Sequence, residues 1–203
     1  MEQDTYKTIS KPTDEVVFKD KNSKFFGYAF PVNSEKQVKN ILDGLKKQHH
    51  SARHWCYAYQ IGTDTDTMKI RANDDGEPNN SAGMPIYGQI QSFELTNILV
   101  VVVRYFGGVK LGVSGLINAY KTTSQLALEN SNIVNEVIKE SFVLTFEYKN
   151  INTVMRIIKE RNLNIISQSF HLNCQIRIEV RKKDSKEVFN IFDNLFEVEI
   201  TAA

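Results

Sequence analysis

A short acidic loop carries the first residues whose types and spacing could do chemistry. Asp74, Asp75 and Glu77 place three carboxylates within four residues. Such oxygens could bind a divalent cation, and one could act as a general base. The alternative is a solvated turn, favoured by Gly76 and Pro78, whose aspartates accept backbone N–H bonds. The spacing favours the turn, because the alternating ligands and final glutamate of an EF-hand loop are missing.

A histidine and a cysteine alternate on a strand expected over residues 54–61. The period of two places His54, Cys56 and Ala58 on one face. A histidine beside a thiol could lower the thiol pKa and create a nucleophile, or the two could supply half of a zinc site. The alternative is a cysteine packed as a small apolar side chain. The sequence favours packing, because no second Cys/His pair lies nearby to complete a zinc site.

An arginine ends the most apolar strand, which is expected over residues 97–106 and is followed by a glycine-rich turn. Backbone N–H groups at the start of the next helix could hold a phosphate beside Arg104 and Tyr105. Alternatively, Arg104 pairs with a carboxylate of the acidic loop and fixes that loop to the sheet. The two interpretations are compatible, because a fixed loop can form the wall of a cleft. The predicted ligand-binding residues are His54, Cys56, Asp74, Asp75, Glu77, Arg104, Tyr105, Gly107 and Gly108.

Two further groups of side chains could contact nucleic acid. Trp55, Tyr57 and Tyr59 share the other face of the 54–61 strand, where they form a stacking platform or, more commonly, part of a core. The basic candidates for contact with a phosphate backbone are Arg177, Arg181, Lys182 and Lys183. A solvated charged face is the alternative for these, because residues 133–203 carry ten basic and ten acidic side chains.

The elements that must position these residues follow from hydrophobic periodicity. Strands are expected over residues 14–19, 24–31, 54–61, 68–72 and 97–106, and helices over about 35–49, 83–92 and 115–130. Ser34 is the expected N-cap of the first helix, with Gln37 completing a capping box. Ser114 is the expected cap of the third helix. The strand at 97–106 is apolar at nearly every position, which predicts burial on both faces.

The C-terminal part reads strand, helix, strand, strand, helix, strand, which is the ferredoxin-like order. Its last strand is expected to close the chain from about Phe196. Two helices would cover one face of this sheet and leave the charged side chains of residues 172–181 on the open face. A change of composition around residues 130–132 separates two predicted domains, 1–132 and 138–203. The predicted fold class is therefore α+β.

Composition excludes several classes of protein. A net charge of +1 over 203 residues argues against a strongly basic nucleic-acid binder, although a local patch remains possible. No apolar run reaches the length of a membrane span, and the polar N-terminal residues do not resemble a signal peptide. The two cysteines, Cys56 and Cys174, are expected to be free thiols in a reducing cytoplasm. We expect no cofactor, no metal and no membrane partner.

Three segments follow one another along the chain: the strand with His54 and Cys56, the acidic loop, and the glycine-rich turn after Arg104. Together, in this order, they resemble the IMPACT/YigZ family. The matching residues are His54, Cys56, Asp74, Asp75, Gly76, Glu77, Pro78, Ala82, Gly83, Pro85, Arg104, Tyr105, Gly107, Gly108, Leu111 and Gly112. The chain departs from the family pattern at Asn80-Ser81, Met84 and Ser114, where relatives usually have Gly-Thr, lysine and glycine. If that lysine binds an anion in relatives, Met84 argues against anion binding here.

The resemblance implies a bacterial two-domain member. Its N-terminal domain would be similar to a βαβ module shared by a small-subunit ribosomal protein, elongation factor G and GHMP-type kinases. Its C-terminal domain would be similar to a ferredoxin-like domain of elongation factor G. Both similarities are fold-level analogies that imply RNA, the ribosome or a translation factor as partner. Eukaryotic relatives restrain a starvation-sensing kinase with an additional domain, and that role is not transferred.

Three functional hypotheses follow. The first is a non-enzymatic cytoplasmic regulator related to translation, which binds RNA, the ribosome or a translation factor. The second is a small-molecule or phosphate-binding protein, or a hydrolase-like enzyme, that uses the Asp74–Glu77 loop and Arg104. The third is a protein-binding module whose motifs only stabilise the fold. No residue is assigned a catalytic role.

Overall fold

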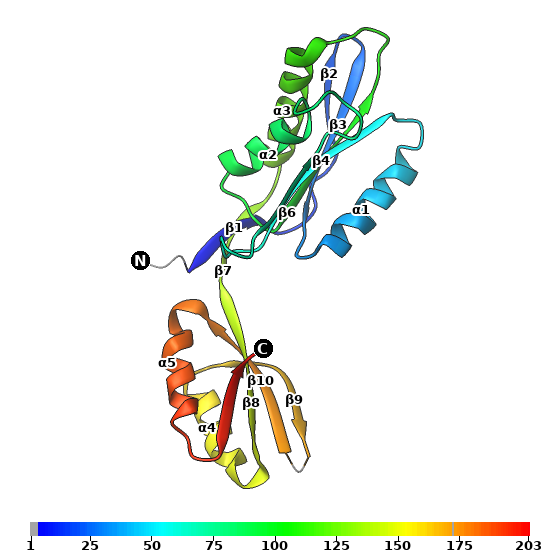
Figure 1. The fold of residues 1–203 in the computed structure, drawn as a ribbon. Helices are drawn as coiled ribbons and strands as arrows, with labels where there is room; N and C mark the ends of the chain where they lie inside the picture. The colour runs from blue at the N-terminus through cyan, green and yellow to red at the C-terminus, as the bar shows by residue number, and fades with distance from the viewer. Residues whose placement is uncertain (1–3, 172) are drawn as a thin grey trace. The chain divides into compact units, whose positions relative to one another are not determined.

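A computed structural model describes residues 4–171 and 173–203, which form helices and sheets in two compact units (Figure 1). One unit spans residues 6–136, and the other consists of residues 137–203 together with residues 4 and 5. Each unit has hydrophobic clusters of its own, so each positions its own candidate residues. The mixed α/β character expected from the sequence is confirmed. Within the described part of the chain, no helix combines the length and apolar character needed to cross a membrane.

A five-stranded antiparallel sheet organises the unit of residues 6–136. Its strands, in spatial order, are β2 (Val16–Asp20), β3 (Ser23–Pro31), β6 (Ile98–Tyr105), β4 (His54–Ile61) and β5 (Lys69–Asn73). Strand β6 occupies the centre, because its run of apolar side chains requires cover on both faces. The burial predicted for this strand is confirmed, since every residue from Ile98 to Arg104 is buried.

Helices cover both faces of this sheet. Helix α1 (Glu35–Gln48) lies on one face, and helices α2 (Gly83–Ser92) and α3 (Gly112–Glu129) lie on the other (Figure 1). The alternation predicted for residues 54–61 is confirmed. Cys56 packs in the cluster that includes side chains of α2 and α3, whereas Tyr59 packs with side chains of α1. Strand β4 therefore presents its side chains to two different environments.

A two-stranded sheet of β1 (Thr5–Ile9) and β7 (Ile133–Val137) is not predicted by the sequence pattern. The residues expected to be a linker, 130–132, lead directly into β7, and the Asn132 carbonyl accepts a hydrogen bond from the Ser10 N–H at 3.0 Å. Two short strands from distant parts of the chain share no hairpin turn. Local periodicity therefore leaves no signal by which to pair them.

The unit of residues 137–203 contains a four-stranded antiparallel sheet. Its strands, in spatial order, are β11 (Val198–Ala202), β8 (Lys139–Glu147), β10 (Asn173–Arg181) and β9 (Asn164–Phe170). Helices α4 (Ile151–Glu160) and α5 (Lys182–Asp193) cover one face (Figure 1). The predicted order of elements is found, and alternate residues of β10 are exposed on the uncovered face.

Ser34 occupies the predicted N-cap position of α1, but the predicted capping box is wrong. The Ser34 side chain makes no capping bond, and Gln37 Oε1 accepts the N–H of Asn33 instead, at 2.8 Å. Ser114 is not a cap, because α3 begins at Gly112, three residues before the expected start, where the positive φ of 77° favours glycine. Strand β8 ends at Glu147, and the next three residues form a short 3₁₀ helix, η1 (Tyr148–Asn150).

Candidate functional site

A buried ion pair joins the end of β6 to the acidic loop. Arg104 Nη1 donates to Glu77 Oε1 at 2.6 Å, and both residues are less than a tenth exposed. The same carboxylate oxygen accepts a hydrogen bond from the Tyr120 hydroxyl of α3 at 2.8 Å. These opposite charges can stay buried because each satisfies the other, and the second hydrogen bond adds to this. The pair fixes the acidic loop to the sheet, which is one of the two roles considered for Arg104.

Cys56 lies beside this pair as a protonated thiol. Its Sγ is 3.3 Å from the Tyr120 hydroxyl oxygen and 3.0 Å from the carbonyl oxygen of Asp74. Burial raises the pKa of the Cys56 thiol far above its ordinary value, and burial likewise raises the pKa of the Tyr120 hydroxyl. His54 Nδ1 is bonded to the carbonyl oxygen of Asp75, at 2.9 Å, and not to the thiol. Because the thiolate is the nucleophilic form, this arrangement favours a packed cysteine over a nucleophile.

The three carboxylates of the acidic loop point to different places. Asp74 accepts the N–H groups of Asn80, Ala82 and Gly83, at 2.8 to 2.9 Å, and so caps the start of α2. Asp75 Oδ2 accepts the N–H of Trp55 at 2.7 Å. Because the third carboxylate is held by Arg104, the three do not converge on a cation. Among residues 4–171 and 173–203, no three His, Cys, Asp or Glu side chains are grouped to hold a metal ion.

A cavity of about 440 Å³ opens beside the ion pair, and we call it the motif cavity. It brings together three of the predicted ligand-binding residues, His54, Glu77 and Arg104. Its other lining residues are Arg53, Pro78, Phe106, Lys110, Leu111, Gly112, Val113 and Leu116. Arg53 and Lys110 are exposed cations that the motif analysis did not single out, and Gly112 is the first residue of α3. Most of this lining is apolar, and its positively charged members are Arg53, Arg104 and Lys110.

The ion pair and the motif cavity lie within a stretch of chain that matches a known family. Residues 21–128, more than half of the chain, match the model described as the Impact N-terminal domain. The chain belongs to the IMPACT family. An IMPACT family member from Haemophilus influenzae is 32% identical over 174 residues, which cover 85% of this chain and 84% of that protein. The membership expected from the motifs is thus confirmed.

Two solved structures extend the comparison. A crystal structure of a hypothetical protein matches with a TM-score of 0.78 at 24% identity, covering 99% of this chain and 98% of that one. This IMPACT family member therefore shares its fold with a solved protein over nearly its whole length. A structure of Yih1, described as a two-domain translational regulator, matches 60% of this chain and 46% of that one at 26% identity. Its TM-score of 0.38 does not establish a shared overall structure.

Tyr105, Gly107 and Gly108 are predicted ligand-binding residues that do not line the motif cavity. Tyr105 faces the α1 side, where its hydroxyl lies 3.1 Å from His49 Nδ1. Gly107 packs so closely on the backbone of Asn22 that an added Cβ would lie 2.1 Å from its carbonyl carbon. Gly108 has a φ of 88°, which favours glycine. Both positions therefore favour glycine for reasons of backbone geometry, the close approach at Gly107 and the positive φ at Gly108.

Tyr120 is a central residue that the motif analysis missed. Its hydroxyl lies between Cys56 and Glu77, so it links β4 to the acidic loop. A signal was present in the sequence, because this tyrosine shares its helical face with Leu116 and Thr123, both of which are buried. A tyrosine at a buried helical position needs a hydrogen-bond partner for its hydroxyl.

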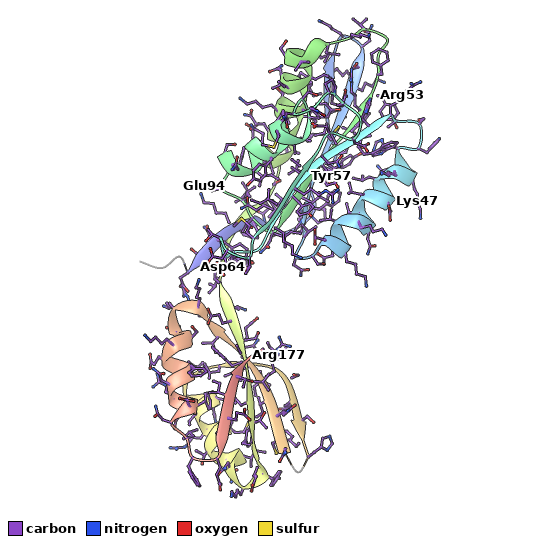
Figure 2. The ribbon with its side chains drawn as sticks, viewed as in Figure 1. Lys47, Arg53, Tyr57, Asp64, Glu94 and Arg177 are labelled. Atoms are coloured by element: carbon purple, nitrogen blue, oxygen red, sulfur yellow. The ribbon has the colours of Figure 1, made fainter. Side chains whose placement is uncertain are left out.

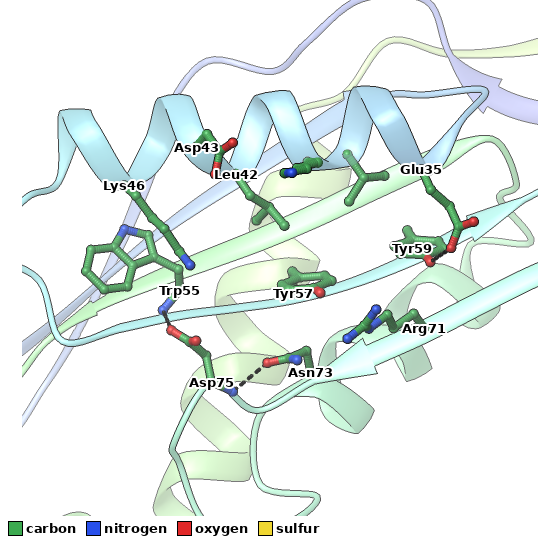
Figure 3. A pocket seen from close by; sticks show the side chains of 12 residues that line it. Glu35, Leu42, Asp43, Lys46, Trp55, Tyr57, Tyr59, Arg71, Asn73 and Asp75 are labelled. Carbon is green, nitrogen blue, oxygen red and sulfur yellow. Dashed lines mark hydrogen bonds between the residues drawn. The ribbon is translucent and has the colours of Figure 1, made fainter.

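A second cavity, of about 340 Å³, lies on the opposite side of the sheet between α1 and strands β4 and β5, and we call it the α1 groove (Figure 3). Trp55, Tyr57 and Tyr59 line it, so the aromatic stripe of β4 is part core and part cavity wall. The Tyr59 hydroxyl donates to Glu35 Oε1 at 2.6 Å. Burial, together with this carboxylate, raises the pKa of Tyr59 to about 12.

The predicted nucleic-acid contacts lie in the unit of residues 137–203, outside the stretch matched by the family model. Arg177 is exposed on the uncovered face of β10 (Figure 2). Arg181 ends that strand and donates from Nε to Asp4 Oδ2 at 2.6 Å, so its charge is paired. Lys182 and Lys183 begin α5. Arg177, Lys182 and Lys183 are therefore the members best placed to meet a phosphate.

Proposed function

We propose that this IMPACT family member is a non-enzymatic regulator related to translation that acts by binding RNA. The observation that carries the proposal is the closed network around Glu77. His54, Cys56, Asp74, Asp75, Glu77 and Arg104 each bond to another motif residue, to Tyr120 or to the backbone, and among these the buried Nε of Arg104 makes no hydrogen bond. Such a network stabilises a scaffold, and function then belongs to the surfaces that the scaffold holds in place. Yih1, one of the matched proteins, is described as a translational regulator.

The finer features of the proposal concern the two units. We assign residues 1–132 to a domain of the ribosomal-protein, elongation factor G and GHMP-kinase type, and residues 138–203 to a ferredoxin-like domain. The second assignment is supported by the element order of residues 139–202 and by the placement of both helices on one face of the sheet. A cytoplasmic location belongs to the same proposal.

The RNA contact we propose for the second domain uses its uncovered sheet face and the adjoining start of α5. Arg177, Lys182 and Lys183 supply the phosphate contacts, because Arg181 is already paired with Asp4. Contacts to phosphate release counterions, so binding must weaken as salt rises. A protein-factor partner is an alternative that the same experiment distinguishes, since it predicts no binding of isolated RNA, whereas a ribosomal partner contacted through its RNA belongs to the RNA proposal.

The test measures affinity for a labelled structured RNA at two salt concentrations, using the full chain freed of bound nucleic acid. The double variant Arg177→Ala/Lys182→Ala removes two phosphate contacts and should lower the slope of log affinity against log salt by roughly 1.5. The control Arg156→Ala/Lys159→Ala removes the same two residue types from α4, on the covered face, and should bind as the unmodified chain does. Absence of binding at low salt refutes the RNA proposal.

The motif cavity favours a second candidate function, the binding of a small anion. Its cations Arg53 and Lys110 have no partner among the ion pairs found in residues 4–171 and 173–203, and α3 begins at its edge. Titration with inorganic phosphate and diphosphate tests this candidate. Lys110→Ala should abolish such binding without unfolding the protein, because Lys110 is exposed and outside the buried network. Undiminished binding by this variant would exclude the cavity as the anion site.

A further inference from the structure

The α1 groove is open on the side of β5, where no side chain of the core cluster under α1 fills it. Val38 and Leu45 of α1 pack with buried side chains of β3, β6 and β4, but that cluster takes no residue from β5. Strand β5 is the edge of the sheet, and its Arg71 is exposed. The cavity of about 340 Å³ between them lies at the small end of the range for ligand pockets. A ligand of this size could enter from the β5 side.

The floor of the groove is a flat aromatic surface. The rings of Tyr57 and Tyr59 are parallel within 7°, and their centroids are 6.4 Å apart. The two rings lie side by side along β4 beneath α1, with Trp55 next in line (Figure 3). Tyr59 is almost fully buried, whereas Tyr57 and Trp55 are partly exposed. A planar ring can therefore stack on Tyr57, with the indole of Trp55 beside it in a different plane (Figure 3).

Hydrogen-bonding groups of the groove lack partners. The Trp55 indole Nε1 is buried and makes no hydrogen bond. A buried donor without a partner costs free energy. Asn73 uses Oδ1 to accept the Asp75 N–H, which leaves its amide N–H₂ as a donor at the β5 side. The Asn73 amide suits the carbonyl and ring-nitrogen acceptors of a nucleobase.

The charged side chains that line the groove are Lys39, Lys46 and Arg71, which are positive, and Glu35, Asp43 and Asp75, which are negative. Glu35 is engaged by Tyr59 and by Lys69, and these contacts hold the pKa of its carboxyl below the ordinary value. Asp75 accepts a backbone N–H. Lys46 lies over the Trp55 ring, with Nζ 5.8 Å from the centroid. With Arg71 on the facing strand, the groove has cations on both of its walls, which suits a ligand with a phosphate group.

We propose that the α1 groove binds one unpaired nucleotide unit, with its base stacked on Tyr57 beside Trp55 and its phosphate between Arg71 and Lys46. The inference rests on the proposed RNA-binding function and adds a site to it. Stacking accepts every base, so the site selects unpaired nucleotides and has little preference for sequence. Bases in a duplex are stacked inside the helix and cannot enter. The nucleotide comes from a single-stranded stretch of RNA or from the free mononucleotide pool.

Trp55 provides a direct readout, because it is the single tryptophan of the chain and lies in the groove. The experiment titrates the full chain with a short single-stranded RNA, a duplex RNA and a mixture of nucleoside monophosphates, recording Trp55 fluorescence and RNA retention separately. We expect the single strand to quench Trp55 at saturation and the duplex to leave it unchanged. Saturable quenching by the monophosphates would support the site with free nucleotides as its source.

Variants of groove residues connect the signal to the site. Tyr57→Leu removes the stacking surface while keeping an apolar side chain, and should weaken binding between about fivefold and 150-fold. Tyr57→Phe retains the ring and should bind as the unmodified chain does. Arg71→Ala should weaken binding, whereas Lys19→Ala removes an exposed cation of β2, away from the groove, and should not.

The outcomes separate this inference from the RNA proposal. RNA binding with unchanged Trp55 fluorescence, and with Tyr57→Leu equal to the unmodified chain, overturns the groove site and leaves the RNA proposal standing. Quenching by monophosphates without any RNA retention supports the groove site and overturns the RNA proposal. Absence of both signals overturns both.

Discussion

Replacing Glu77 by leucine should destabilise the unit of residues 6–136 strongly. The Glu77 and Arg104 side chains are 4% and 7% exposed, so water replaces the lost partner only in part, from the motif cavity. Removing one member of a buried ion pair costs about 3–5 kcal/mol, because the other charge is left uncompensated. With a urea m value of about 2 kcal/mol/M, the unfolding midpoint should fall by about 2 M. Tyr120 also loses its carboxylate acceptor, which adds to the loss.

The assay is urea unfolding followed by the fluorescence of Trp55, which lies on β4 and so reports on this unit. The double variant Glu77→Leu/Arg104→Leu removes both charges and should be more stable than Glu77→Leu alone, because no unpaired charge remains. A loss below about 1 kcal/mol for Glu77→Leu would match an exposed ion pair. That result would refute the claim that the pair is desolvated.

Three further predictions concern buried groups and one close backbone approach. Burial lowers the pKa of His49, which lies between the hydroxyls of Tyr28 and Tyr105, so the neutral ring stabilises the fold and this contribution is lost as pH falls below about 6.5. His49→Gln should remove that acid-side decline in the urea midpoint, and an unchanged decline would exclude His49 as its source. Because burial raises the pKa of Cys56, its contribution is present at neutral pH and is lost as pH rises above about 8.5. The thiol should resist alkylation in the native protein at neutral pH and react in urea, and equal rates would contradict its burial. Gly107→Ala should cost about 1–3 kcal/mol because of its close approach to the backbone, whereas an unaltered melting temperature would show that the turn relaxes freely.

The sequence could predict that Arg104 pairs with a carboxylate, because the need of a buried arginine for a negative partner follows from its residue type alone. An arginine at the end of a buried strand needs an anion, and the acidic loop offers three. Which carboxylate pairs with it depends on how the loop folds. The structure selects Glu77 because Asp74 is committed to the start of α2 and Asp75 to the backbone of Trp55. Tertiary contacts decide which of the three carboxylates takes which role, and the spacing of these residues in the sequence does not predict those contacts.

The strand patterns could also be predicted from residue types and their period. The contacts that were not predicted join segments that are far apart in the sequence. The alternation of β4 follows from its period of two, and the burial of β6 from its composition. The pairing of β1 with β7, and the hydrogen bonds of Tyr120 with Cys56 and Glu77, join segments that are far apart in the sequence. No local pattern carries such information. The early start of α3 depends on the positive φ angle of Gly112. Glycine permits such an angle but does not require it, so the sequence does not predict it.

Asp75 of the acidic loop is a poor probe of function. Its carbonyl oxygen accepts from His54, which lines the motif cavity, and its carboxylate accepts the N–H of Trp55, which lines the α1 groove. Because consecutive residues of β4 face opposite sides of the sheet, one loop residue supports both sites. Asp75→Ala should therefore disturb both, and loss of a ligand in that variant would not say where the ligand binds. Substitutions of Lys110 and Tyr57 separate the sites, because each lines one cavity and takes no part in the bonds of the acidic loop.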